Sequence, residues 1–282
     1  MGSEFEEKQY EELLNFELAE QRKIFPAGQV LEHTIAVDSA MYSRSPDFWG
    51  LWKQSSRAKG GVRLTRKLWD DLKSTINSDS FPRFKCNLFI QYKRPKLISS
   101  PNGKARGYWK RPYYRYEIDP HQQGILQKLE HRTRRNAIVV YACGAFDKWK
   151  DLWHFSTSTA LVKNSNFVRP RSMKGHEKYT FVRGGRNGRG YSEPEELPLV
   201  DILKEIDTRV ANNSESGSNT EFLFLLSAQI GNVAAEFPQE FAKIYAAMMR
   251  LIEFPQHELA GSISSILAFT FLTNLSWSVA FE

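Results

Sequence analysis

A ten-residue apolar segment that ends in two polar side chains constrains the fold of this chain more than any other feature. The segment runs from residue 84 to residue 93 and is followed by Pro95. Alternate residues of a strand face opposite sides, so Gln91 and Lys93 lie on one face and Tyr92 lies on the other. A proline lacks the backbone donor that a sheet needs, which ends the strand. The segment therefore predicts a buried strand that carries an amide oxygen and an ammonium to one place at its end.

The other apolar patterns predict an α/β (α+β) chain with a mixed sheet flanked by helices. Helix-forming residues with interleaved leucines predict a first helix over residues 6–23. An aspartate followed by a proline predicts the start of a helix over residues 119–135. This helix lies between a short alternating strand over residues 113–118 and a valine-rich strand over residues 137–142. The order strand, helix, strand predicts a crossover between two parallel strands of one sheet.

Weaker patterns add further elements. Residues 29–42 predict one or two extended segments, and residues 65–76 predict a helix that leads into the strand at residue 84. Residues 160–183 predict two more short strands around a basic loop. The first five residues resemble the remnant of an expression tag, so we expect them to take no part in the fold.

The chain is expected to divide into three regions. These are a nuclease-like domain over residues 6–190, a helix and linker over residues 191–219, and a C-terminal helical subdomain of three helices over residues 220–282. The polar run from Asn212 to Asn219 is typical of a linker. Residues 259–281 carry no charge but many serines and threonines, which favours a buried helix over a membrane span.

Charge is strongly segregated along the chain. The net charge is +7, yet residues 21–189 hold 34 basic and 12 acidic side chains. A basic block of this size favours a polyanionic partner, because neutralised phosphates release counterions. The alternative is a solvated basic surface. Six basic residues are the candidate nucleic-acid contacts: Lys110, Arg111, Arg115, Arg183, Arg186 and Arg189.

Cysteine usage and the N-terminal residues indicate the compartment. Cys86 and Cys143 lie far apart in apolar segments and match no metal or disulfide spacing, which predicts buried free thiols in a reducing environment. The first twenty residues lack the apolar run of a secretory signal. We therefore expect a cytoplasmic protein with no membrane span.

Two acidic residues upstream of the long strand complete a candidate site. Glu32 and Asp38 add two carboxylates to Gln91 and Lys93. Oxygen ligands with one cation beside them are the composition of a Mg²⁺-dependent phosphodiester hydrolase. Each residue taken singly also has a structural explanation, such as a turn for Asp38 or a strand end for Lys93.

The sequence from residue 89 to residue 93 (FIQYK), preceded by Glu32 and Asp38, resembles the PD-(D/E)XK restriction-endonuclease-like superfamily in a variant with glutamine in its final motif. The segments over residues 112–119 and 137–142 are similar to bacterial proteins with that domain. The resemblance covers residues 6 to about 183. It implies a central mixed sheet with an aspartate at the end of one strand and an acid-X-lysine pair on the next.

The resemblance also implies roles for these residues. Asp38 would bridge a Mg²⁺ or Mn²⁺ ion, and Gln91 and the carbonyl of Tyr92 would complete its shell. Lys93 would position the attacking water and offset the charge that develops on the phosphate. Glu32 would be the outer carboxylate. Two residues of the first helix compete with it for this place: Glu17 and Glu20.

The chain departs from the family pattern at two positions. Gln91 replaces the usual acid, which removes a negative charge from the metal site, and Val37 precedes Asp38 where the pattern has proline. Glutamine still offers a carbonyl oxygen, a ligand that Mg²⁺ accepts.

The residues and the resemblance together imply two functions. The first is a metal-dependent endonuclease that acts on DNA, with RNA as the other possible polymer, and that serves as an effector in bacterial antiviral defence or restriction. The second is a non-catalytic nucleic-acid-binding or assembly protein that keeps the nuclease scaffold. In both cases the apolar C-terminal helices are expected to form a homodimer or a hetero-complex.

Overall fold

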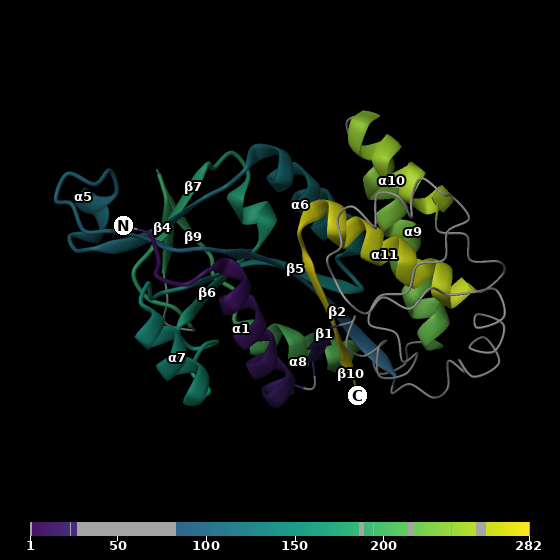
Figure 1. The fold of residues 1–282 in the computed structure, drawn as a ribbon, viewed down its shortest axis with the longest axis horizontal. Coiled ribbons are helices and arrows are strands. Elements are labelled where there is room, and N and C mark those ends of the chain that lie inside the picture. Colours follow the sequence, from purple (N-terminus) through teal and green to yellow (C-terminus); the bar gives the residue numbers. More distant parts are fainter. Residues whose placement is uncertain are drawn as a thin grey trace, which may run out of the picture.

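The computed structural model describes residues 2–22, 24–26, 83–185, 189–193, 195–213, 217–237, 239–251 and 258–281. These residues form a mixture of helices and strands with two five-stranded sheets (Figure 1). One sheet is mixed and the other is antiparallel. The predicted mixed α/β fold class is thereby confirmed.

The first sheet contains the long strand that the sequence predicts. Its order is β1 (Ile24–Pro26), β10 (Ser276–Phe281), β2 (Phe84–Lys93), β5 (Ala137–Gly144) and β6 (Ser165–Val168). Strands β2 and β5 are parallel, and the other pairs are antiparallel. Both central strands are buried almost throughout, as expected of parallel strands with helices on both faces.

A long crossover joins β2 to β5. It contains β3 (Lys96–Ile98), the short helix α5 (Arg106–Trp109), β4 (Tyr113–Glu117) and α6 (Pro120–Thr133). The predicted parallel pairing of the strand at 113–118 with the strand at 137–142 is wrong, since β4 belongs to the other sheet and β5 pairs with β2. The reason is burial: β4 is only partly buried, whereas a central parallel strand is apolar on both faces.

The second sheet packs one face into the core. Its order is β3, β4, β7 (Lys178–Phe181), β8 (Gly190–Ser192) and β9 (Glu195–Leu197). Tyr116, Tyr179 and Phe181 share one core cluster with residues of β2, β5 and α6. Strands β6 and β7 are the two short strands predicted within residues 160–183.

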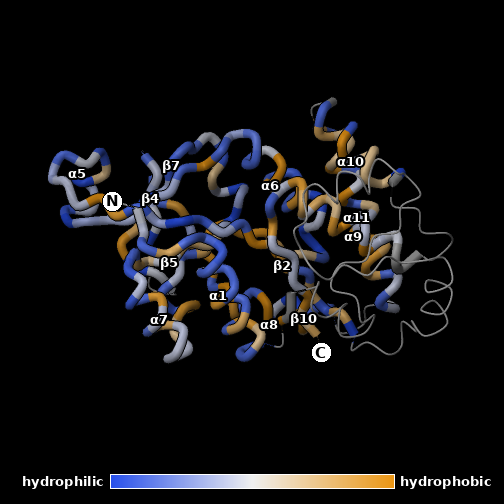
Figure 2. Tube along the Cα trace, viewed as in Figure 1, coloured by the Kyte–Doolittle hydropathy of each residue, from blue (hydrophilic) through white to orange (hydrophobic). Residues whose placement is uncertain are grey.

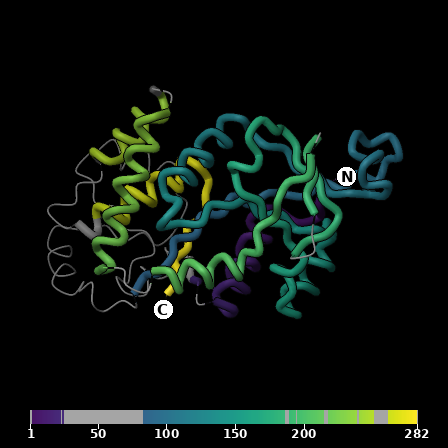
Figure 3. Tube along the Cα trace, turned by 180° about the vertical axis from the view of Figure 1, so that it is seen from behind, coloured from purple at the N-terminus to yellow at the C-terminus, as the bar shows by residue number. Residues whose placement is uncertain are grey.

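Two helical layers cover the first sheet. One face packs against α1 (Glu7–Arg22), α7 (Trp149–Thr157) and α8 (Ile202–Asn212). Helices α1 and α8 lie side by side in both views (Figures 1 and 3). The tube of α1 alternates between hydrophilic and hydrophobic colours, as an amphipathic helix does (Figure 2). Helix α1 confirms the predicted first helix, and α8 confirms the predicted helix after residue 190.

The other face packs against α6 and the C-terminal helices. These are α9 (Asn219–Ala235), α10 (Gln239–Leu251) and α11 (Glu258–Thr273). A short 3₁₀ helix over Pro170–Met173 also contacts α6 and β5. The N-cap of α6 is as predicted, because Asp119 accepts a hydrogen bond of 2.8 Å from the backbone N–H of Gln122.

The C-terminal residues correct one prediction. The expected helix over residues 259–281 ends at Thr273, and residues 276–281 form strand β10 between β1 and β2. Asn274 has a left-handed backbone with φ 54°, the conformation in which asparagine often ends a helix. Beyond it, Trp277 and Val279 face one core cluster and Ala280 faces the other, which is strand alternation.

The N-terminal residues correct a second prediction, namely that the first five residues take no part in the fold. Phe5 is 1% exposed and packs in the core cluster beneath α1. The backbone N–H of Glu4 donates to the carbonyl of Asp147 at 2.8 Å, and its carboxylate accepts from the first backbone N–H of α7 at Trp149. Residues 2–5 therefore take part in the fold, because the ring of Phe5 packs against the rings of Tyr10 and Phe146.

The remaining predictions concern two segments outside the described residues, the two cysteines and membrane spans. The extended segments at 29–42 and the helix at 65–76 lie outside the described residues. Cys86 and Cys143 are buried free thiols, as predicted, and burial raises the pKa of Cys86 to about 12. Within the described ranges, no helix combines the length and the apolar character that crossing a membrane requires.

Candidate functional site

The end of strand β2 brings Gln91 and Lys93 to a single partner. The Lys93 ammonium donates a hydrogen bond of 2.9 Å to Gln122 Oε1. Gln122 Nε2 in turn donates to Gln91 Oε1 at 2.6 Å. The two strand residues therefore face the same side, as their spacing predicts. The amide of Gln122 joins them into one hydrogen-bonded unit.

Gln122 is a site residue that the sequence analysis missed. It is the third residue of α6, and an aspartate N-cap followed three residues later by glutamine resembles a capping box. In a capping box the glutamine side chain would turn back to the N-cap. Here it reaches across to β2 instead, and Nε2 also donates to the carbonyl of Thr273 at the end of α11. The capping-box pattern is visible in the sequence. Only the packing of α6 on the sheet decides the direction in which the Gln122 side chain points.

Burial and charge act in opposite directions on Lys93. The side chain is half-buried, its ammonium lies 5.7 Å from the centre of the Tyr141 ring, and burial lowers the pKa of Lys93 below its usual value. The carboxylates of Glu7 and Asp119 oppose this shift because they favour the charged lysine. A desolvated ammonium beside polar groups is an environment typical of functional lysines.

Among the acids of the first helix, Glu7 is the one whose charge acts on Lys93. It is the first residue of α1, and burial raises the pKa of its carboxyl while Lys93 lowers it. Electrostatic contact with Lys93 therefore comes from Glu7, at the N-terminal end of α1, and from Asp119, at the N-terminal end of α6.

The two helix residues predicted as alternative outer carboxylates lie elsewhere. Glu17 is 2% exposed and accepts hydrogen bonds from the backbone N–H groups of Leu161 and Val162, at 2.6 and 3.0 Å. Ten residues of helix place it roughly 15 Å along α1 from Glu7. Glu20 is exposed. Glu17 therefore stabilises the turn before β6, and the structure does not bring it to Lys93.

The other predicted acids, Glu32 and Asp38, lie outside the described residues. The strands that pair with β2 are β10 and β5. Neither of these strands contains an aspartate or a glutamate. The described neighbours of β2 thus supply no carboxylate of the kind that the family pattern places on an adjacent strand.

The described residues alone do not complete a metal site. Both predicted ligand oxygens near Lys93 accept hydrogen bonds within the chain, Gln91 Oε1 from Gln122 and the Tyr92 carbonyl from Gln91 Nε2 at 3.2 Å. Among the described residues, no group of three or more histidines, cysteines, aspartates or glutamates could hold a metal ion.

The candidate nucleic-acid contacts gather around the second sheet. Lys110 and Arg111 follow α5, Arg115 lies on β4, Arg183 follows β7 and Arg189 precedes β8. Arg186 lies outside the described residues.

The side-chain partners of these basic residues differ. The side chains of Lys110, Arg111 and Arg183 are exposed, whereas Arg115 pairs with Glu117 at 3.3 Å. Arg189 pairs with Glu196 and also donates to the hydroxyl of Tyr108. The hydrogen bond from Arg189 to Tyr108 thus joins the segment that carries Lys110 to the segment that carries Arg189, although these two basic residues are 79 positions apart in sequence.

Comparison with known proteins gives no assignment: no protein-family model, no curated protein and no solved structure matches the chain.

Proposed function

We propose that the protein is a Mg²⁺- or Mn²⁺-dependent endonuclease that hydrolyses phosphodiester bonds of DNA, with its reaction centre at the end of β2. The observation that carries the proposal is the hydrogen-bonded unit of Gln91, Gln122 and Lys93. A half-buried ammonium held in place at a sheet end is suited to the charge that develops on a phosphate during hydrolysis. The parallel pair β2 and β5, with α6 in the connection between them, is compatible with a restriction-endonuclease-like sheet.

The metal-binding part of the proposal rests on Asp38 and Glu32. When bound, a divalent ion polarises the phosphate and activates water. The chain's own contribution is to keep Lys93 charged and oriented, through Gln122, Glu7 and Asp119. The basic segment supports a DNA substrate, and the buried free thiols support a cytoplasmic location. A role in bacterial antiviral defence or restriction is the last part of the proposal.

A second candidate function has its own supporting observation. Gln91 Oε1 already accepts a hydrogen bond of 2.6 Å from Gln122, which uses one of the two lone pairs of the oxygen that a metal would need. This favours a protein that binds nucleic acid, or assembles on it, without cutting it.

A cleavage assay separates the two functions. The full chain is incubated with supercoiled plasmid in Mg²⁺, in Mn²⁺ and in EDTA, and binding is measured in EDTA by gel shift. We expect nicking only with metal, and a loss of about 10²-fold or more in rate for Asp38→Ala and for Lys93→Ala. Lys150→Ala, which removes an exposed lysine of α7, is the matched control and should cut normally.

Gln91→Glu tests the ligand role directly. A carboxylate at this position would accept the same hydrogen bond from Gln122 and restore a negative charge beside Lys93. Equal or higher metal affinity is therefore expected. Binding without cleavage by the unaltered chain in both metals would instead establish the non-catalytic function.

A further inference from the structure

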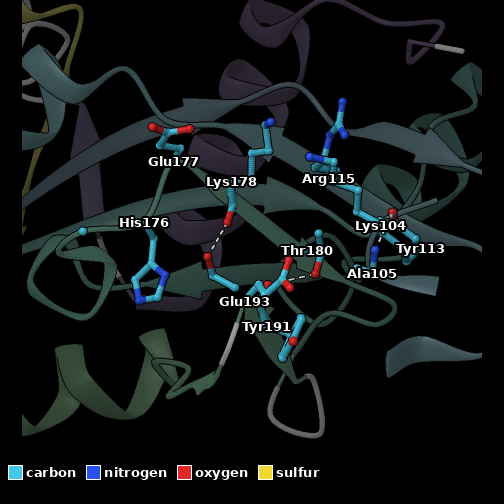
Figure 4. A pocket seen from close by; sticks show the side chains of 12 residues that line it. Lys104, Ala105, Tyr113, Arg115, His176, Glu177, Lys178, Thr180, Tyr191 and Glu193 are labelled. Atoms are coloured by element: carbon cyan, nitrogen blue, oxygen red, sulfur yellow. Dashed lines mark hydrogen bonds between the residues drawn. The ribbon is translucent and has the colours of Figure 1, made fainter. Parts of the chain in front are cut away.

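A cavity of about 300 Å³ lies on the second sheet, away from the face that packs in the core (Figure 4). Its walls come from β4, β7 and β8, from the turn before β7, and from the segment that leads into α5. This volume is at the lower end of the range typical of small-molecule sites.

Strand register decides which side chains reach the cavity. Arg115 on β4 lies opposite Thr180 on β7, which lies opposite Tyr191 on β8. Residues directly opposite one another in a sheet share a face. These three side chains therefore lie on one face, while their neighbours Tyr116 and Tyr179 point into the core.

Three cations line the cavity, from three different segments of the chain. They are Arg115, Lys178 and Lys104. The guanidinium of Arg115 is mostly buried, and its Nη2 lies 3.3 Å from Glu117. Its Nε is buried and has no hydrogen-bond partner in the described part of the chain. The guanidinium carries more N–H donors than the pair with Glu117 uses, so its exposed part can donate to an anionic oxygen in the cavity.

An aromatic wall stands beside these cations. The ring of Tyr191 lines the cavity and stacks on Tyr108, with ring centres 3.8 Å apart and planes 10° apart. Trp109 packs edge-on against Tyr108, and its Nε1 donates to Thr180 Oγ1 at 2.9 Å. These contacts fix the Tyr191 ring in place. Fixed aromatic rings beside cations are how proteins hold single nucleotides of unpaired strands.

Two carboxylates also line the cavity, and they narrow the class of ligand. Glu177 and Glu193 are exposed at its edge. They would disfavour a bare polyphosphate, but they can accept hydrogen bonds from sugar hydroxyls and base N–H groups. The combination of cations, a fixed aromatic ring and acceptors fits a nucleotide better than it fits an inorganic anion.

We propose that this cavity binds one nucleotide unit of a single-stranded nucleic acid, with its phosphate at Arg115 and Lys178 and its base beside Tyr191. A single strand is specified because a base must leave its stack to enter a cavity. The site extends the proposed nuclease function and rests on it for the source of the strand. A free nucleotide carries the same chemistry, so the experiment separates the two sources.

Binding is measured by fluorescence anisotropy of a short fluorescein-labelled single-stranded DNA on the full chain in EDTA. Arg115→Ala and Tyr191→Ala should each weaken binding roughly tenfold or more, because each removes a contact to one nucleotide. Tyr191→Phe keeps the ring and should bind normally. Lys150→Ala, with the same charge change as Arg115→Ala but away from the cavity, should change affinity less than about twofold. Circular dichroism of each variant checks the fold.

Two further outcomes identify the source of the bound nucleotide and the result that would overturn the inference. Displacement of the labelled strand by adenosine monophosphate, at concentrations where unlabelled strand also displaces it, would assign the cavity to a free nucleotide. Unchanged affinity in both Arg115→Ala and Tyr191→Ala would overturn the inference, even if the protein cuts DNA. Because metal is absent, a failure of cleavage leaves this binding result intact, so the two proposals fail separately.

Discussion

At the scale of single residues, Lys93 differs from the rest of the strand that carries it. Most of β2 is apolar and buried, yet its last residue places an ammonium where burial disfavours the charge. Gln122, Glu7 and Asp119 offset only part of this cost. Residues that break the local preference for an apolar side chain are common at functional or strained sites, which supports the proposed role of Lys93.

The pKa of Lys93 provides a test at this scale. We expect its pKa to lie below 10.5, and Glu7→Gln to lower it further, because the Glu7 carboxylate favours the charged lysine. Between the lowered pKa and 10.5 the unfolded chain holds more protons on this lysine, so the contribution of Lys93 to the free energy of unfolding should rise with pH in this window. Buried tyrosines such as Tyr10, whose pKa burial raises, contribute in the opposite direction, so the Lys93 contribution is read as the difference between the unaltered chain and Lys93→Met. Lys93→Met should abolish the rise. NMR titration of ¹³C-labelled lysine and urea unfolding across alkaline pH measure both effects, and a pKa at or above 10.5 would contradict the assignment.

Gly190 offers a steric test in the core of the second sheet. A Cβ at this position would lie 1.8 Å from the hydroxyl oxygen of Tyr179. Tyr179 is fully buried, and its hydroxyl donates to Asn166, so it has no room to move. Gly190→Ala should therefore lower the free energy of unfolding by about 1–3 kcal/mol, measured by urea denaturation.

Gly124 is the matched control for this prediction. A Cβ there meets nothing within 4 Å on the surface of α6, so Gly124→Ala should stabilise the chain by up to about 1 kcal/mol. Tyr179→Phe should reduce part of the Gly190→Ala cost by removing the closest atom. Equal stability of the two alanine variants would show that Gly190 has no steric role.

At the scale of elements, strand β10 ties the two ends of the chain together. It pairs with β1 on one side and β2 on the other, and its contacts with β2 are as extensive as those between β2 and β5. Trp277 Nε1 also donates to Asn87 of β2 at 3.0 Å. A strand with partners on both edges uses all its backbone groups, so the last residues stabilise the same sheet that holds Gln91 and Lys93.

A proline within β10 tests this arrangement. Ser278 is 2% exposed and pairs with Leu88 and Pro26. Ser278→Pro removes a backbone donor from the middle of a sheet and should cost about 3 kcal/mol or more, whereas Ser278→Ala keeps the donor and should cost much less. Thermal unfolding by circular dichroism compares them. Equal melting temperatures would mean that β10 contributes little to the sheet.

At the scale of the whole molecule, apolar surface concentrates on the C-terminal helices. Five large apolar side chains there are at least 41% exposed: Phe224, Leu225, Ile244, Leu267 and Phe271. Exposed apolar surface of this kind usually marks an interface. It supports the proposed homodimer or hetero-complex through these helices, and a homodimer would place two candidate sites on one DNA.

Oligomeric mass tests the interface. We expect the unaltered chain to behave as a homodimer in light scattering and the double variant Phe224→Ser, Phe271→Ser to shift toward the monomer. Phe16→Ser is the control, because Phe16 is 64% exposed on α1, on the other helical layer. A monomeric unaltered chain, or a double variant that stays dimeric, would contradict the homodimer. Because β10 follows α11, the interface must be tested by substitution and not by truncation.

The sequence by itself determined the local structure of this protein. The bounds of β2, the start of α6 at its aspartate cap, the first helix, the two buried thiols and the common face of Gln91 and Lys93 all follow from short-range rules. These rules concern residues a few positions apart, whose relation the backbone geometry fixes wherever the segment packs.

Only the tertiary structure decided which segments meet. The insertion of β10 beside β2, the transfer of β4 to the second sheet and the reach of Gln122 to Lys93 join residues that are distant in sequence. The burial of Phe5 and the grouping of Arg115 with Tyr191 are of the same kind. Strand pairing uses backbone groups that every residue carries, so the side chains of one segment do not specify its partner, and the choice is made by how the whole apolar surface is buried.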